Sequence, residues 1–344
     1  MSMLFCILTF PCISLGNQYA VISNESKGVR AGVYTFTWDD ESLSVKHHYS
    51  SSDNINVMGR TKDYTIPEDA MDDAVKTMKN YYITISNKFP KAKIFCTISS
   101  AYSRVKNVED LKSRIRSDVQ CPTEIITAEK EAYYGILSSI PPKRRSQSVL
   151  IDTGSGNTKV GAMIGSRIES VEIPYGTVTL RKAAQDEGGD YIVALNSLIK
   201  SKVLNDYLKT VREKPALANR KRIYWIGGAG WATSAFTHPE RAEKDFIYIN
   251  SKDLTSFYTI LQNNEWLERK ATPAKVGGKA VAEKANDAMQ KVRDTFTRED
   301  LLAGVSIIRG LLTVSPQGSE LIFCRNGNWI FGYALEKSEG GADE

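Results

Sequence analysis

Ser148-Val-Leu-Ile-Asp-Thr-Gly-Ser-Gly-Asn-Thr-Lys159 is the stretch that decides the fold of this chain of 344 residues. Its apolar half predicts a buried strand over 148–151, and its polar half predicts a tight turn built on glycines. Glycines have no Cβ, so consecutive backbone N–H groups can converge there on one phosphate, although many hairpins carry similar letters for turn geometry alone. Asp152, where the strand ends, is placed to hold a water or a Mg²⁺ beside that phosphate. The turn residues expected to contact phosphate are Gly154, Ser155, Gly156, Asn157 and Thr158.

A second strand and glycine turn follow at 221–236. The apolar residues 223–226 predict the strand, and Gly227, Gly228 and Gly230 lead from it into a helix. The first turn of a helix presents unpaired N–H groups, so this arrangement is a second anion or nucleotide site. Two turns of this kind predict one cleft between two walls.

Glu131 lies in the segment 127–137, which predicts a helix that connects the two halves of the chain. Its carboxylate precedes Asp152 in the sequence and could activate a water molecule as a general base. Glu131 also falls in the first helical turn, where the helix dipole favours carboxylates. A purely structural role for Glu131 is therefore an open alternative.

Strands alternate with helices along most of the chain, which predicts an α/β fold. Residues 274–288, rich in lysine and glycine, are expected to form a mobile loop or a loose helix. The expected strands include 19–22, 32–36, 93–97 and 124–126, and the expected helices include one opening at Pro67 and others over 190–211, 252–264 and 298–313.

Composition is that of a globular chain long enough for two domains. The net charge of +5 is too modest for a dedicated DNA-binding protein, although it suits a polyanionic substrate. The three histidines and the cysteines beyond the leader have no metal-ligand spacing, so a zinc site is not expected.

Residues 1–16 carry no charge and contain the apolar run 3–10, which resembles the core of a secretory signal peptide. We expect a signal peptide here and an exported or periplasmic protein. The alternatives are a mis-assigned start or an extra strand, with a cytoplasmic location. The run is too short to cross a bilayer as a helix, so no stable membrane span is expected.

In the order of its segments the chain resembles the exopolyphosphatase and guanosine pentaphosphate phosphohydrolase family, within the actin, hexokinase and Hsp70 superfamily. The resemblance implies two ribonuclease-H-like domains with a cleft between them, expected over 17–131 and 132–335, ahead of a polar tail at 336–344. It also implies Mg²⁺ as cofactor and hydrolysis of terminal phosphate from polyphosphate or a phosphorylated guanosine nucleotide such as pppGpp. A homodimer is the expected assembly. The segments that carry the resemblance are 19–34, 99–107, 125–135, 150–159, 173–180, 226–236 and 325–332.

Position by position, the resemblance makes Glu131 the base that activates water. It makes Asp152 the acidic residue that assists the metal and the phosphate. Besides the turn residues above, the phosphate-binding positions that it implies are Gly227, Gly228, Ser26 and Arg104.

Several positions depart from the family pattern. Ser23 and Glu25 stand where the family has aspartate and glycine, so a metal-facing charge is lost and a carboxylate stands near the phosphate. Ser103 replaces a phosphate-contacting arginine, one residue before Arg104, and Lys159 replaces an acidic residue. Three hypotheses follow: a phosphoanhydride hydrolase, a catalytically degenerate phosphate- or nucleotide-binding regulatory protein, and an exported nucleoside di- and triphosphatase.

Overall fold

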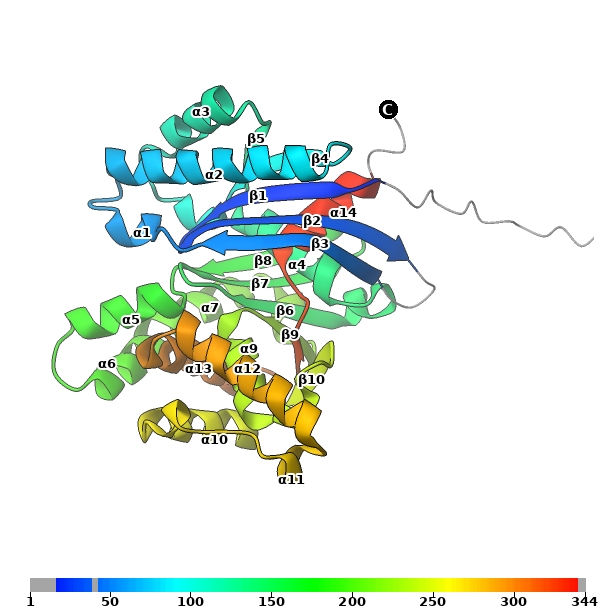
Figure 1. Cartoon of the computed structure of the whole chain (residues 1–344). Coiled ribbons are helices and arrows are strands. Elements are labelled where there is room, and N and C mark those ends of the chain that lie inside the picture. Colours follow the sequence, from blue (N-terminus) through cyan, green and yellow to red (C-terminus); the bar gives the residue numbers. More distant parts are fainter. Residues whose placement is uncertain (1–16, 39–42, 340–344) are drawn as a thin grey trace, which may run out of the picture.

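The computed structural model describes residues 17–38 and 43–339, and the expected signal peptide lies outside the described residues. The chain is built on two mixed β-sheets, one in each half of the molecule (Figure 1). Helices cover these sheets, and the two halves meet along a central helix. Among residues 17–38 and 43–339, no helix is both long enough and apolar enough to cross a membrane.

The first sheet has the strand order β3-β2-β1-β4-β5. Its first three strands form an antiparallel meander, whereas β1, β4 and β5 run parallel to one another. β1 is buried along almost its whole length, because sheet neighbours lie on both sides of it. The strands are β1 (Tyr19–Glu25), β2 (Gly28–Trp38), β3 (Leu43–Asp53), β4 (Lys93–Ile98) and β5 (Thr123–Ile125).

One long helix covers the first sheet. α2 (Glu68–Lys88) begins directly after Pro67, as expected, and buries Ala70, Ala74, Met78 and Ile85, which recur at helical spacing along one side. The shorter helices of this half are α1 (Val57–Arg60) and α3 (Val108–Val119), with a 3₁₀ turn at Ser100–Tyr102.

The second sheet repeats this plan in the order β10-β11-β9-β6-β7-β8. An antiparallel meander, β6 to β8, is again followed by parallel strands, here β9 beside β6 and β11 beside β9. The repeated plan confirms the predicted fold class of two ribonuclease-H-like, actin-like domains. The strands are β6 (Ser148–Thr153), β7 (Thr158–Ile164), β8 (Arg167–Ile173), β9 (Arg222–Ile226), β10 (Phe246–Ile249) and β11 (Glu320–Cys324).

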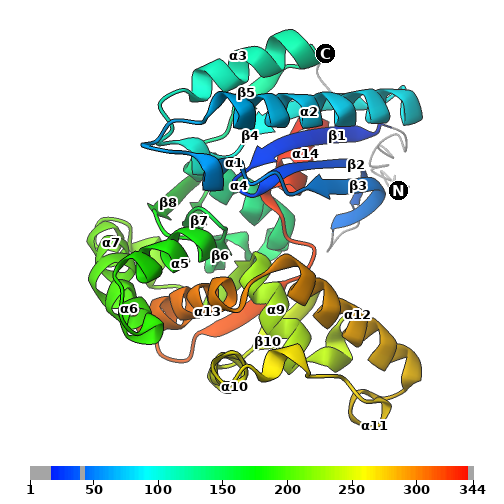
Figure 2. The ribbon, with the colours of Figure 1, turned by 60° about the vertical axis from the view of Figure 1, so that its left-hand side comes forward.

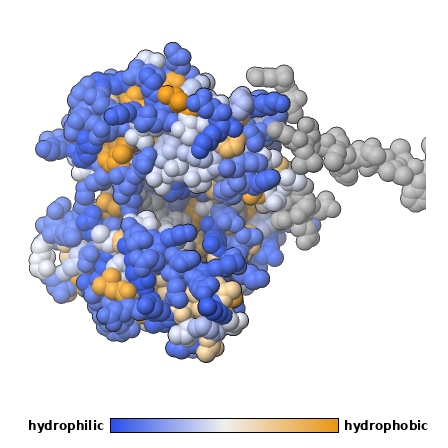
Figure 3. Space-filling view, in the orientation of Figure 1, coloured by the Kyte–Doolittle hydropathy of each residue, from blue (hydrophilic) through white to orange (hydrophobic). Residues whose placement is uncertain are grey.

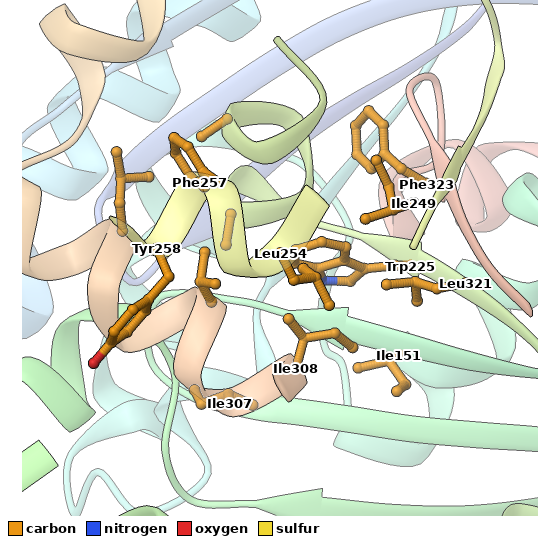
Figure 4. Packing of buried hydrophobic residues seen from close by; sticks show 14 of the residues in the cluster. Ile151, Trp225, Ile249, Leu254, Phe257, Tyr258, Ile307, Ile308, Leu321 and Phe323 are labelled. Atoms are coloured by element: carbon orange, nitrogen blue, oxygen red, sulfur yellow. The ribbon is translucent and has the colours of Figure 1, made fainter. Parts of the chain in front are cut away.

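The second domain has the larger apolar core. Trp225 on β9 is fully buried, and Phe257 and Ile308 contribute to the same cluster from two neighbouring helices (Figure 4). The helices of the second domain are α5 (Thr177–Asp186), α6 (Tyr191–Leu198), α7 (Leu204–Val211), α8 (Pro215–Ala218), α9 (Gly228–Thr237), α10 (Ser251–Gln262), α11 (Pro273–Val276), α12 (Lys279–Thr295) and α13 (Arg298–Thr313), with a π-helical segment at Ile199–Val203 and 3₁₀ turns at Pro142–Gln147, Pro239–Arg241 and Glu265–Leu267.

Of the two structures expected for 274–288, the mobile loop is wrong, and most of the segment is helical. Gly277 and Gly278 only separate α11 from α12, and α12 is a regular helix of 17 residues from Lys279. One side of it buries Ala282, Ala285 and Met289, so tertiary packing stabilises a segment whose composition is rich in lysine and glycine.

Two helices link the domains. α4 (Ala128–Ser139) packs through Tyr134 and Leu137 against the first sheet, and through Ile136 against the second. α14 (Trp329–Glu339) returns to lie on α4 and on the first sheet (Figures 1 and 2). α14 continues to Glu339, so residues 336–339 of the expected polar tail are helical.

Candidate active site

A cavity of about 450 Å³ lies where the two domains face each other. The face shown in Figure 3 is hollowed between the two domains. Residues of both domains line the cavity, including Ser26 and Ala101 from the first and Asp152 and Gly228 from the second. The cavity is the predicted cleft.

The predicted turn between β6 and β7 forms one wall of the cavity. Gly154 N–H donates to the carbonyl oxygen of Asn157 at 3.1 Å, which closes the turn. The start of α5 holds the turn from behind, because Thr177 N–H donates to the carbonyl oxygen of Gly154 at 2.9 Å. The Thr179 hydroxyl likewise donates to the carbonyl oxygen of Gly156 at 2.8 Å. The turn is therefore fixed before any ligand arrives.

The second glycine turn stands beside the first, because β6 and β9 are parallel neighbours that end at the same edge of the sheet. Gly227 has φ of +110°, and a Cβ there would collide with the carbonyl oxygen of Thr153. Only glycine fits both restraints. Gly227 and Gly228 line the cavity, and α9 begins at Gly228, so the N–H groups of its first turn lie at the cavity.

The first domain closes the cleft at the same turn. The hydroxyls of Ser26 and Ser155 form a hydrogen bond between the domains. A Cβ on Gly156 would come within 3.0 Å of Ala101 Cβ, so the turn lies close against the opposite wall. Asn157 also crosses the cleft, since its Nδ2 donates to Ser100 Oγ at 3.1 Å.

The carboxylates of Glu131 and Asp152 lie close to each other, and an ammonium group lies between them. Lys159 Nζ is 2.8 Å from Glu131 Oε2 and 3.0 Å from Asp152 Oδ2. It is also 3.3 Å from Asn157 Oδ1. The second oxygen of Glu131 accepts a hydrogen bond from Ser100 N–H at 2.6 Å. Both oxygens of Glu131 are thus engaged.

Burial separates the roles that the two carboxylates can have. Glu131 has no exposed surface and is not among the residues that line the cavity. Asp152 does line the cavity and is 6% exposed. Burial raises the pKa of Asp152, against the opposing effect of Lys159. In this structure Asp152 is therefore the carboxylate that a ligand would meet.

Lys159 keeps its charge in this environment. Burial lowers the pKa of Lys159, but the carboxylates of Asp152 and Glu131 outweigh burial, so the pKa lies above its usual value. Near the cavity mouth, burial raises the pKa of Glu25, and Arg30, 3.7 Å away, opposes this. Glu25 thus lies in the cavity wall with a cation beside it.

The residues present do not fit the Mg²⁺ that the fold family implies. Mg²⁺ requires about six oxygen ligands at about 2.1 Å, and its carboxylate ligands must turn their oxygens toward it. Here the oxygens of Glu131 and Asp152 that face one another already contact the ammonium group of Lys159. Across residues 17–38 and 43–339, no group of three or more His, Cys, Asp or Glu side chains could hold a metal ion.

Two of the predicted phosphate contacts do not lie in the cavity. Arg104, expected to take the place of the arginine at Ser103, is exposed on the loop after the 3₁₀ turn and does not line the cavity. Thr158 is buried beneath the turn, where its hydroxyl donates to the carbonyl oxygen of Tyr175 at 2.8 Å. The predicted positions that do line the cavity are Ser26, Asp152, Gly154, Ser155, Gly156, Asn157, Gly227 and Gly228.

Sequence reasoning noticed Lys159 only as a departure from a pattern and assigned it no role. The hairpin register places Lys159 directly opposite Asp152, and that pairing was a usable signal. Sequence reasoning also missed aromatic side chains that line the cavity, Trp231 and Phe296, whose ring centroids are 6.2 Å apart. Lys27 Nζ lies 4.5 Å from the ring centroid of Phe296.

Paired ribonuclease-H-like domains around a cleft with two glycine turns define a protein of the actin-like fold class. The Ppx/GppA phosphatase family model matches residues 47–236, which is more than half of the chain. The chain therefore belongs to the Ppx/GppA family, a family of phosphohydrolases.

Solved structures agree on the fold at low sequence identity. The Aquifex aeolicus member of the Ppx/GppA family is 15% identical with a TM-score of 0.67, over 95% of this chain and 99% of that one. An exopolyphosphatase from Cytophaga hutchinsonii is 14% identical with a TM-score of 0.69, over 94% of this chain and 98% of that one. No curated protein sequence matches the chain.

Proposed function

We propose that the protein hydrolyses the terminal phosphoanhydride bond of polyphosphate or of a phosphorylated guanosine nucleotide. One observation carries this proposal: the turns at 154–157 and 227–228 meet in a single cavity with the carboxylate of Asp152 between them. Backbone N–H groups from two turns can hold a phosphoryl group from two sides. Family membership supports the reaction class.

The chemistry assigned to the chain is an attack of water on the terminal phosphorus. The bond from that phosphorus to the bridging oxygen breaks, the shortened substrate leaves with the bridging oxygen, and a proton of the attacking water passes to a carboxylate. We assign that carboxylate to Asp152, because it faces the cavity and burial raises its pKa toward the range of a useful base. Glu131 then holds Lys159 in place from behind.

Phosphate release tests the proposal and the assignment together. Purified protein is incubated with polyphosphate, pppGpp, ATP and GDP, with and without Mg²⁺, and compared with Asp152→Asn and Glu131→Gln. We expect release from polyphosphate or pppGpp that is abolished in D152N and only reduced in E131Q. Full activity in D152N with none in E131Q would return the base to Glu131. Preference for ATP and GDP would instead support a nucleoside di- and triphosphatase.

A second candidate function is a catalytically degenerate regulatory protein that binds a phosphorylated ligand. The observation in its favour is the ion pairing of both carboxylates with Lys159, which occupies one oxygen of each that a metal ion or a water molecule would otherwise meet. Binding of polyphosphate or pppGpp by calorimetry, with no phosphate release from any member of the panel, would establish it. Steady turnover would exclude it.

A further inference from the structure

We propose that Lys159 is a tethered cation that takes the place of the divalent metal ion in this cleft, so that phosphate binds without Mg²⁺. This inference rests on the proposed phosphate cleft and adds a statement about its counter-ion. It begins from the disagreement described above between the residues present and a magnesium site.

The position of Lys159 is built into the fold. Lys159 on β7 pairs with Asp152 on β6 in the hairpin register, so the two side chains are direct cross-strand neighbours. Glu131 reaches the same point from α4, which packs on β7. A Cβ on Gly161 of β7 would come within 3.0 Å of Ala132 Cβ, so a glycine permits this close approach of helix and strand.

The ammonium group also lies next to the phosphate-binding turn. An ideal Cβ on Gly154 would be 3.5 Å from Lys159 Nζ, so the charge lies close under the first glycine of that turn. Lys159 is one of the residues that line the cavity, although it is only 4% exposed. A positive charge in this position acts on an anion through a medium with little water, where screening is weak.

The charges around the cavity explain why a cation is needed there. Glu25, Glu131 and Asp152 influence one another electrostatically, and the cations that act on this group are Lys159 and Arg30. Without Lys159, three carboxylates would face one guanidinium, and a phosphate would have to enter against that charge. In a metal-dependent site a divalent ion performs this neutralisation.

Hydrogen bonding distinguishes a tethered cation from a lysine that contacts substrate directly. An ammonium group has three protons, and Lys159 Nζ has three acceptors, on Glu131, Asp152 and Asn157. Its directional contacts are thus used within the protein. Its effect on a phosphate is therefore one of charge, without direct coordination of the phosphate oxygens.

Metal binding by the protein alone tests the inference without reference to hydrolysis. Mn²⁺, as a paramagnetic stand-in for Mg²⁺, is titrated into wild type and Lys159→Ser, and bound metal is measured by electron paramagnetic resonance. We expect no stoichiometric site in wild type up to about 1 mM metal, and one site per chain in K159S, where two carboxylates are released. Lys130→Gln, which alters an exposed lysine on α4, is the matched control and should behave as wild type.

Inorganic phosphate supplies the second measurement. Its affinity for wild type, measured by calorimetry, should change by less than about threefold between EDTA and Mg²⁺, whereas K159S should lose about tenfold in EDTA and recover with Mg²⁺. A stoichiometric Mn²⁺ site in wild type, or a larger gain in its phosphate affinity with Mg²⁺, overturns the inference. So does a folded K159S variant that gains no metal site.

Circular dichroism first establishes that K159S is folded. If it is not, Lys159→Gln, which keeps most of the volume, takes its place, and the wild-type measurements remain decisive by themselves. A protein that releases no phosphate from any substrate but gives the expected metal results would refute the hydrolase proposal and leave the inference on Lys159 standing.

Discussion

Replacing Lys159 by methionine removes the charge between two buried carboxylates while keeping a flexible side chain of similar length. The exposed fractions of the Lys159, Glu131 and Asp152 side chains are 5%, 0% and 8%. Removal of one partner of a buried ion pair costs about 3–5 kcal/mol, because the remaining charge stays buried without a counter-ion. In K159M two carboxylates lose the same counter-ion, so we expect the free energy of unfolding near neutral pH to fall by at least about 3 kcal/mol.

The loss should become smaller on acidification. Burial already holds the pKa of Asp152 above 3.8, with Lys159 opposing it, and without Lys159 the pKa rises further. A carboxyl group whose pKa is higher in the folded state gives stability that is complete below the unfolded pKa and is lost as pH rises through the folded pKa. From neutral pH down to about pH 5, K159M should therefore regain stability relative to wild type.

Urea unfolding followed by tryptophan fluorescence measures the change, and one of the five tryptophans of the chain lies close to the site. Trp225 is fully buried, and its indole N–H donates to Thr153 Oγ1 at 3.0 Å, one residue from Asp152. The control is Lys130→Gln, whose exposed ion pair with Glu124 should contribute less than about 1 kcal/mol. A K159M variant within about 1 kcal/mol of wild type near neutral pH, or one with an equal loss at pH 5, would refute this account of the ion pairs.

Three further substitutions probe the rest of the cleft. Gly227→Ala should lower the free energy of unfolding in urea by about 1–3 kcal/mol, because φ is +110° and the new Cβ would collide with a neighbouring carbonyl oxygen. The control is Gly165→Ala, at φ +59° in open space, which should lower the free energy of unfolding by less. Equal losses in the two variants would argue against the collision. Trp231→Ala should raise KM for pppGpp but not for polyphosphate, since only the nucleotide has a base to stack; parallel changes would exclude stacking. Ser26→Ala removes the hydrogen bond across the cleft and should weaken phosphate binding severalfold in calorimetry. The free energy of unfolding should change by about 1 kcal/mol or less. An unchanged phosphate affinity would show that this contact does not hold the cleft closed.

Local sequence patterns predicted the strands and turns whose structure depends on residues adjacent in the sequence. The apolar runs before Gly154 and Gly227 are strands, and the glycines form the turns, because backbone geometry there admits little else. β3 was not predicted, since most of its residues are polar and it lies at the sheet edge, where no alternating apolar face is needed. The helix α12 was obscured by the glycines that precede it.

The sequence indicated which residues belong to the site, but it did not indicate how tertiary packing arranges them. The carboxylates of Glu131 and Asp152 both contact Lys159 Nζ, but the position of Lys159 between them depends on how α4 packs on β7. No sequence spacing encodes that packing. Arg104 was misplaced for a similar reason, because the direction of a loop side chain is set by contacts outside the loop.

The pairing of Lys159 also bears on which of the two proposed functions applies. Hydrolysis requires extra stabilisation of the phosphoryl oxygens in the transition state, beyond the stabilisation that the bound ground state receives. Lys159 is held by three protein acceptors and cannot move toward the phosphoryl group without breaking buried contacts, so its charge favours the bound anion and the transition state to a similar degree. Uniform stabilisation of this kind strengthens binding more than it accelerates reaction. A hydrolase built on this cleft must therefore obtain its selectivity for the transition state from the N–H groups at 155–157 and 227–228 and from Asp152, because Gly154 N–H is used to close the turn. A binding protein needs nothing more than the cleft already contains.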